Sequence, residues 1–158
     1  MRRKAAYSEV ESADVQAAGA SLGLSIHVLE AGSTEQVDKV FASLRERKIS
    51  ALLVNANPLF LVLRDKLVTL TAHYAVPTIY YVREYASNGG LMSYGSRIPE
   101  AMRQCGNYVG RILKGESPAD LPVVQPTKFE LVINRKTAEG LELTIPPSLL
   151  ARADEVIE

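Results

Sequence analysis

The sequence predicts an α/β protein built on a parallel sheet with helical crossovers. Two short runs, Ile49–Val54 and Thr78–Val82, have the apolar, β-branched and aromatic composition of strands. Between them lies a helix-like segment, Leu63–Tyr74, which ends before Pro77. Strands that alternate with helices over short connections must run parallel, with right-handed crossovers.

Composition limits the possible functions. The chain has 158 residues, and its 18 Lys and Arg balance its 18 Asp and Glu. A chain of this length can bury a core without disulfides or a metal. The charge balance argues against a nucleic-acid or anionic-membrane partner, and the single Cys105 excludes a disulfide framework and a cysteine zinc site. We expect no metal and no cofactor.

The first part of the chain predicts two helices and a strand. Apolar residues recur at helical spacing before Gly23, a typical residue just beyond a helix end. Leu24–Leu29 alternates with the period of a strand. Ser33 and Gln36 form a capping box before an amphipathic stretch. The run Ile49–Val54 that follows is expected to be buried on both faces of the sheet.

The second half predicts a strand at Leu91–Tyr94 and a long helix over Ile98–Leu113, whose apolar stripe faces inward. Cys105 lies on that stripe and is expected to be a small core residue. Three prolines make Ser117–Thr127 an extended connector. A strand, Phe129–Ile133, then leads to a short helix capped by Asn134, and to a last helix over Ser148–Ile157.

Three segments should lie beyond the carboxyl ends of parallel strands, where open sheets bind ligands: 55–60, 83–85 and 93–96. Their amides, guanidinium, carboxylate, hydroxyls and rings suit a small polar solute with an apolar body. The residues alone favour a simpler interpretation. In it, Asn55 and Asn57 form a turn, and Arg83 pairs with Glu84 at the surface.

The sequence offers no candidate for catalysis. His27 and His73 lack ligands at metal-binding spacing, and neither a phosphate loop nor a G-x-S-x-G elbow occurs. We therefore predict that the protein is not an enzyme.

Several longer motifs resemble the substrate-binding proteins of ABC transporters. The resemblance is to a group common in soil α-proteobacteria and related to aromatic-amino-acid binders, and it is densest from Pro77 onward. The motifs that carry it are GLMSYG at 90–95, GRILKGE at 110–116, PADLP at 118–122, QPTKFELVIN at 125–134 and IPPSLLARADE at 145–155.

The resemblance implies a type I periplasmic-binding-protein fold, in which two α/β lobes enclose a ligand. This chain would be the second half, with the first lobe missing. Residues 1–85 would form the C-terminal lobe, and 86–126 the hinge crossing and a helix belonging to the N-terminal lobe. Residues 127–158 would then be the return strand and C-terminal helices. The family is periplasmic; with no signal peptide, this chain as written would remain cytoplasmic.

The resemblance also implies ligand-binding residues. We expect Tyr80, Arg83 and Tyr94 to be accessible and to converge on one concave surface, while Tyr81 packs against a helix. The family often has Glu-Trp where this chain has Tyr81 and Val82, so its ligand preference should differ. The full matching set is Asn57, Pro58, Phe60, Tyr80, Arg83, Glu84, Ser93 and Tyr94.

The function these observations predict is the substrate-binding component of an ABC importer, which binds an amino-acid-like solute in an interlobe cleft. The chain is expected to be truncated and impaired, with an ABC permease as its partner. Its uncovered helix predicts a homodimer. The alternatives are a small cytosolic flavodoxin-like regulator and the effector-binding lobe of a transcription regulator.

Overall fold

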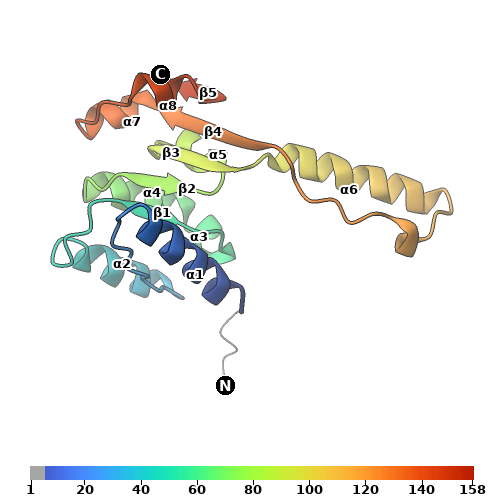
Figure 1. The fold of residues 1–158 in the computed structure, drawn as a ribbon, viewed down its shortest axis with the longest axis horizontal. Coiled ribbons are helices and arrows are strands. Elements are labelled where there is room, and N and C mark those ends of the chain that lie inside the picture. Colours follow the sequence, from blue (N-terminus) through green and yellow to red (C-terminus); the bar gives the residue numbers. More distant parts are fainter. Residues whose placement is uncertain (1–5) are drawn as a thin grey trace. The chain divides into compact units, whose positions relative to one another are not determined.

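The computed structural model describes residues 6–158, with side chains from Val10 onward (Figure 1). The chain forms two compact units, one ending at Ala42 and the other running from Ser43 to Glu158. The prediction that no signal peptide is present rests largely on the first residues of the chain, and residues 1–5 lie outside the described part.

The first unit contains the helices α1 (Ala6–Ser21) and α2 (Thr34–Ser43). Gly23 ends the first helical segment with a φ of 69°, a conformation that glycine adopts without strain. The predicted capping box is confirmed at α2. The Gln36 amide donates to Ser33 Oγ at 3.3 Å, and the Gln36 side chain accepts from the Gly32 amide at 2.6 Å.

The predicted strand Leu24–Leu29 is wrong. Residues 24–30 contain no strand, and the side chains of Leu24 and Val28 are exposed. Alternation of apolar residues indicates an extended backbone, but a strand also needs a neighbour to pair with. Nothing in a single segment of sequence shows whether that neighbour is present.

The second unit is built on a five-stranded sheet in the order β1-β2-β3-β4-β5. The first three strands are parallel, as predicted, whereas β4 runs antiparallel to β3 and parallel to β5. The fold class is therefore α/β with a mostly parallel sheet. The strands are β1 (Leu52–Val54), β2 (Thr78–Tyr80), β3 (Met92–Ser96), β4 (Phe129–Asn134) and β5 (Glu155–Ile157).

Helices connect these strands. As predicted, the Asn134 side chain caps α7, where it accepts from the Thr137 amide at 3.0 Å. The helices of this unit are α3 (Pro58–Val62), α4 (Arg64–His73), α5 (Arg83–Ser87), α6 (Ile98–Leu113), α7 (Arg135–Gly140) and α8 (Pro147–Leu150), with a 3-10 turn at Pro118–Asp120.

Two predicted elements differ from the structure. The last helix stops at Leu150, and β5 follows, because Asp154 donates its amide to the Leu131 carbonyl and so begins pairing with β4. Pairing with a distant strand thus overrides the local helical pattern. The first strand is not buried on both faces, because Leu53 lies on the edge strand β1 and is 59% exposed.

Three neighbouring core residues share one face of the sheet. Tyr80, Ser93 and Val132 are register neighbours on adjacent strands, and all three side chains are buried. Because neighbouring residues in register share a face, they point to the same side. The ring of Tyr80 stacks on that of Tyr85 in α5, with 4.4 Å between the centroids.

The helix α6 buries none of its side chains in the described part of the chain. The prediction that its apolar stripe faces inward is therefore wrong, as is the expectation that Cys105 is a core residue, since this cysteine is exposed. In Figure 1, the connector after α6 runs back beside the helix, and the Tyr108 hydroxyl donates to the Pro122 carbonyl. Among the described residues, no helix has the length and apolar character needed to cross a membrane.

Gly95 allows two segments of the second unit to cross closely. A Cβ atom at this position would lie 1.8 Å from the carbonyl oxygen of Tyr81. The segment that leads from β2 into α5 therefore passes directly over β3 at Gly95. Any side chain here would push that segment, and Arg83 with it, away from the sheet.

Replacing Gly95 by alanine should lower the free energy of unfolding by about 1–3 kcal/mol, the usual cost of overpacking. Urea unfolding followed by circular dichroism measures this change. Gly106 is the matched control, because it lies inside α6, where an added Cβ atom would meet no neighbouring group within 4 Å. Gly106→Ala should be neutral or stabilising by up to about 1 kcal/mol. Equal stability of Gly95→Ala and the natural chain would contradict the close crossing.

Candidate functional site

The candidate residues belong to one edge of the sheet in the second unit. The carboxyl ends of β1, β2 and β3 share this edge because these strands are parallel. Since β4 is antiparallel to β3 and parallel to β5, the first residues of β4 and β5 lie at the same edge. The edge therefore combines loops from the middle of the chain with Glu130 and Glu155 from its end.

The first candidate loop has a structural role. The Asn57 side chain caps α3 by accepting from the Leu59 amide at 2.8 Å, and Pro58 occupies the first turn of that helix. The Phe60 carbonyl accepts a hydrogen bond from the Tyr85 hydroxyl at 2.7 Å. The interpretation of Asn57 as part of a local turn is therefore correct, and the loop is tied to α5 through Tyr85.

Tyr80 is buried, so the prediction that its side chain is solvent-accessible is wrong. It is 1% exposed, and its hydroxyl lies 2.9 Å from Thr71 Oγ1. Burial raises the pKa of Tyr80 and also that of Tyr85. Tyr81 packs as predicted, with its ring centroid 5.7 Å from that of Tyr85 in α5.

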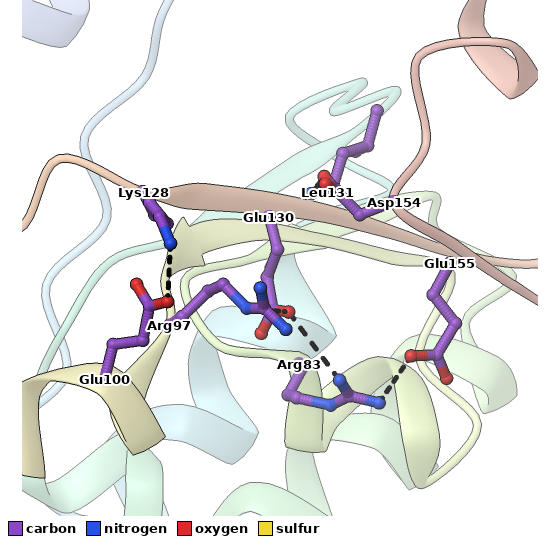
Figure 2. A network of polar contacts seen from close by, with 8 residues as sticks. All are labelled: Arg83, Arg97, Glu100, Lys128, Glu130, Leu131, Asp154 and Glu155. Atoms are coloured by element: carbon purple, nitrogen blue, oxygen red, sulfur yellow. Dashed lines mark hydrogen bonds and ion pairs between the residues drawn. The ribbon is translucent and has the colours of Figure 1, made fainter. Parts of the chain in front are cut away.

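Arg83 lies at the start of α5, and its guanidinium contacts two carboxylates from the end of the chain. Arg83 Nη2 donates to Glu155 Oε2 at 2.7 Å, and Arg83 Nη1 lies 3.6 Å from Glu130 Oε2 (Figure 2). The hydrogen bond to Glu155 is the main reason that the pKa of Arg83 is raised. Arg83 thus pairs with Glu155 and Glu130, and the alternative in which it pairs with Glu84 is wrong.

Two buried oxygen atoms near this edge lack a hydrogen-bond partner within the described residues. They are Glu84 Oε2, at the start of α5, and Ser93 Oγ, in the middle of β3. Buried polar atoms are normally satisfied. Both residues belong to the set that the family resemblance predicts to bind ligand.

Tyr94 is accessible, as predicted, at 56% exposure. Its ring stacks against that of Phe129 on β4, with 5.8 Å between the centroids, and Phe129 is 51% exposed. Because adjacent residues of a strand point to opposite faces, Tyr94 lies on the face opposite to Ser93 and its register neighbour Tyr80. The prediction that Tyr80, Arg83 and Tyr94 converge on one surface is therefore wrong. Glu130 and Glu155, which Arg83 contacts, share the face of Ser93, and Tyr94 lies on the other face.

Sequence reasoning missed the carboxylates at this edge and the second arginine, Arg97. Glu130 is 6% exposed although it lies in a strand predicted from the alternation of Phe129, Leu131 and Ile133. The buried positions in β4 include Glu130, Val132 and Asn134 as well as Ile133. A charged residue in a strand is a weak signal, because its partners, Arg83 and Arg97, are distant in sequence.

No cluster of three or more metal-ligating side chains occurs among residues that the structure describes. The polar edge offers hydrogen bonds, charge pairs and ring stacking. These interactions suit recognition of a small solute.

Comparisons with known proteins identify the family of the chain. Residues 2–157 match the family model for ABC transporter substrate binding protein, so the chain belongs to that family. No curated protein sequence matches the chain significantly.

Among solved structures, the chain is similar to an ABC domain from Streptococcus pneumoniae in complex with L-Trp, with 25% identity and a TM-score of 0.84 over 95% of this chain and 50% of that one. A conserved domain protein from Vibrio cholerae shows the same fold, with 23% identity and a TM-score of 0.82 over 94% of this chain and 50% of that one. The ligand-free, open structure of a Clostridium difficile substrate binding protein with adhesive properties also shows this fold. It is 19% identical, with a TM-score of 0.67 over 98% of this chain and 52% of that one. The chain thus spans about half the length of these proteins.

Because Tyr80 and Tyr85 are buried, the free energy of unfolding should decrease at alkaline pH. Their pKa values are raised in the folded state, so their contribution is complete below pH 10 and is lost as pH rises toward the folded-state values. The free energy of unfolding should fall by up to about 1.4 kcal/mol per pH unit for each such tyrosine. Urea unfolding between pH 8 and 11 measures the slope.

Tyr85→Phe should reduce this slope, because it removes one hydroxyl that is protected from ionisation in the folded state only. Tyr94→Phe is the matched control, since the Tyr94 ring is exposed, and it should leave the slope unchanged. If Tyr94→Phe reduced the slope as much as Tyr85→Phe, the assignment of the alkaline dependence to the buried pair would fail.

Proposed function

We propose that the chain is half of a solute-binding protein that serves an ABC importer, and that its solute is amino-acid-like. The observation that carries the proposal is the family match over residues 2–157. A similar structure, 25% identical, holds L-Trp. The rival functions, a flavodoxin-like regulator and the effector-binding lobe of a transcription regulator, lack such support. In this role the protein binds without catalysing a reaction.

We propose that the solute binds at the polar edge of the sheet, with Arg83 as the group that receives its carboxylate. The guanidinium can offer two parallel donors to a carboxylate. Glu155, which is bonded to Arg83, has a side chain 42% exposed, so a solute carboxylate would compete with it. The partnerless oxygens of Glu84 and Ser93 are further candidates for polar contact.

The exposed rings of Tyr94 and Phe129 form a flat aromatic surface on the face of the sheet opposite to Glu130 and Glu155. These two rings are therefore not assigned to the solute that Arg83 would receive. The remaining members of the predicted set act as supports. The start of α3 is formed by Asn57, Pro58 and Phe60. The Tyr80 ring stacks on the Tyr85 ring and so holds α5 in place.

The half-length match supports a division of the chain between two lobes. In this proposal, residues 1–85 belong to the C-terminal lobe, and 86–126 include the hinge crossing and a helix of the N-terminal lobe. Residues 127–158 form the return strand and the C-terminal helices. The proposed partners are an ABC permease and a small solute. The proposed location is the periplasm, as for the family.

A lobe studied alone should bind its solute weakly. A cleft ligand contacts both lobes, and the loss of about 4 kcal/mol would convert micromolar affinity to roughly millimolar. Calorimetry with L-tryptophan should therefore show no dissociation constant tighter than about 100 μM. A submicromolar constant for the monomer would contradict this expectation.

Amide chemical shifts test the site itself. L-Tryptophan at millimolar concentrations should shift the amides of Arg83 and Glu84 more than those of α4. Tryptamine, which lacks the carboxylate, should not perturb Arg83. Shifts confined to other parts of the sheet, or no shifts with either compound, would contradict the proposed site.

We also propose that this chain, taken alone, forms a homodimer through the apolar stripe of α6, formed by Ile98, Met102, Val109 and Ile112, whose side chains are all exposed. Val109→Glu should shift the chain toward the monomer in light scattering at tens of micromolar, since it places a charge in the stripe. Asn107→Glu is the matched control on the opposite face of the helix, and should leave association unchanged. A monodisperse 17 kDa species from the natural chain would contradict the dimer.

A further inference from the structure

Glu130 is a buried carboxylate held between two guanidinium groups. Its side chain is 7% exposed, and its Oε2 atom lies 3.6 Å from Arg83 Nη1 and 3.4 Å from Arg97 Nε. Figure 2 shows both arginines converging on this carboxylate from different segments of the chain. Arg83 is also bonded to Glu155 at 2.7 Å, so the four groups together are electrically neutral.

The two arginines belong to parts of the second unit with different roles. Arg83 begins α5, which packs on the core face of the sheet. Arg97 lies between β3 and α6, at the point where the chain leaves the sheet. Glu130 itself lies near the start of β4, where the chain returns. The carboxylate therefore joins the body of the sheet to the base of α6.

Two further contacts connect the outgoing and returning segments beside Glu130. The Arg97 amide donates to the Lys128 carbonyl at 3.3 Å. Lys128 Nζ donates to Glu100 Oε1 at 2.9 Å, which joins the connector to the first turn of α6 (Figure 2). Lys128 is 65% exposed, and exposed pairs contribute little. The buried carboxylate is therefore the member on which the others depend.

We propose that Glu130 is the hub of an ion-pair clamp, formed with Arg83 and Arg97, that fixes the base of α6 to the sheet. The clamp is a conformational device that goes beyond solute binding, because Glu130 and Arg97 are not among the proposed solute contacts. Removing the charge of Glu130 leaves two guanidiniums side by side with one exposed partner, Glu155. The repulsion between them should loosen the point where α6 leaves the sheet.

Hydrogen exchange measures this loosening directly. In Glu130→Gln, the Arg97 amide should exchange about tenfold faster or more, because its bond to the Lys128 carbonyl opens when the base of α6 moves. Amides of α4, such as that of Leu67, should be unaffected. Glu116→Gln is the matched control, because Glu116 pairs with Arg111 at the far end of α6; it should leave Arg97 exchange unchanged.

A second variant keeps the test decisive if Glu130→Gln folds poorly. Arg97→Gln removes one arm of the clamp at a half-exposed position and should also accelerate exchange at the base of α6. In the double variant, the loss of exchange protection at the base of α6 should be smaller than the sum of the two single losses, because both substitutions break the same network. Unchanged exchange of the amide at position 97 in both variants, additive effects, or equal acceleration in α4 would each overturn the clamp.

Discussion

The pairing of Gly95 with Glu130 across β3 and β4 is the contact on which the polar edge of the sheet depends. At Gly95 the strand has no side chain, so the Tyr81 backbone can pass directly over it and deliver Arg83 to the edge. Opposite it, Glu130 supplies the negative charge beside which Arg83 and Arg97 lie. A larger residue at Gly95 or a neutral one at position 130 would disturb the same group, the Arg83 guanidinium. Backbone geometry and charge are thus specified by one register pair.

Features determined by neighbouring residues could be predicted from the sequence. The caps at Ser33 and Asn134 join a side chain to an amide three residues further on, so the printed order of residues contains the whole interaction. The parallel arrangement of β1, β2 and β3 followed from short connections, which permit few topologies. The candidate edge followed in turn, because parallel strands end on the same side. This reasoning, together with the family resemblance, predicted that Arg83 and Tyr94 lie near this edge.

Features that require a distant partner could not be predicted. Leu24–Leu29 has the pattern of a strand but no strand pairing, whereas Glu155–Ile157 has the pattern of a helix end and becomes β5 through pairing with β4. The stripe of α6 shows which side of that helix is apolar, and says nothing about what covers it. The same limit explains Glu130 and Glu155, whose arginine partners lie 33 to 72 residues away along the chain.

Tyr80 and Arg83 illustrate how a family motif combines two kinds of residue. Three positions apart, they were both expected to contact the solute, yet one is 1% exposed and stacked on Tyr85, and the other carries its charge to the sheet edge. The packing of Tyr80 also affects the position of Arg83. Tyr85 is held by the Tyr80 ring on one side and the Phe60 carbonyl on the other, which fixes α5, and Arg83 is the first residue of that helix. A residue can therefore belong to a binding motif by positioning the helix that carries the charged group.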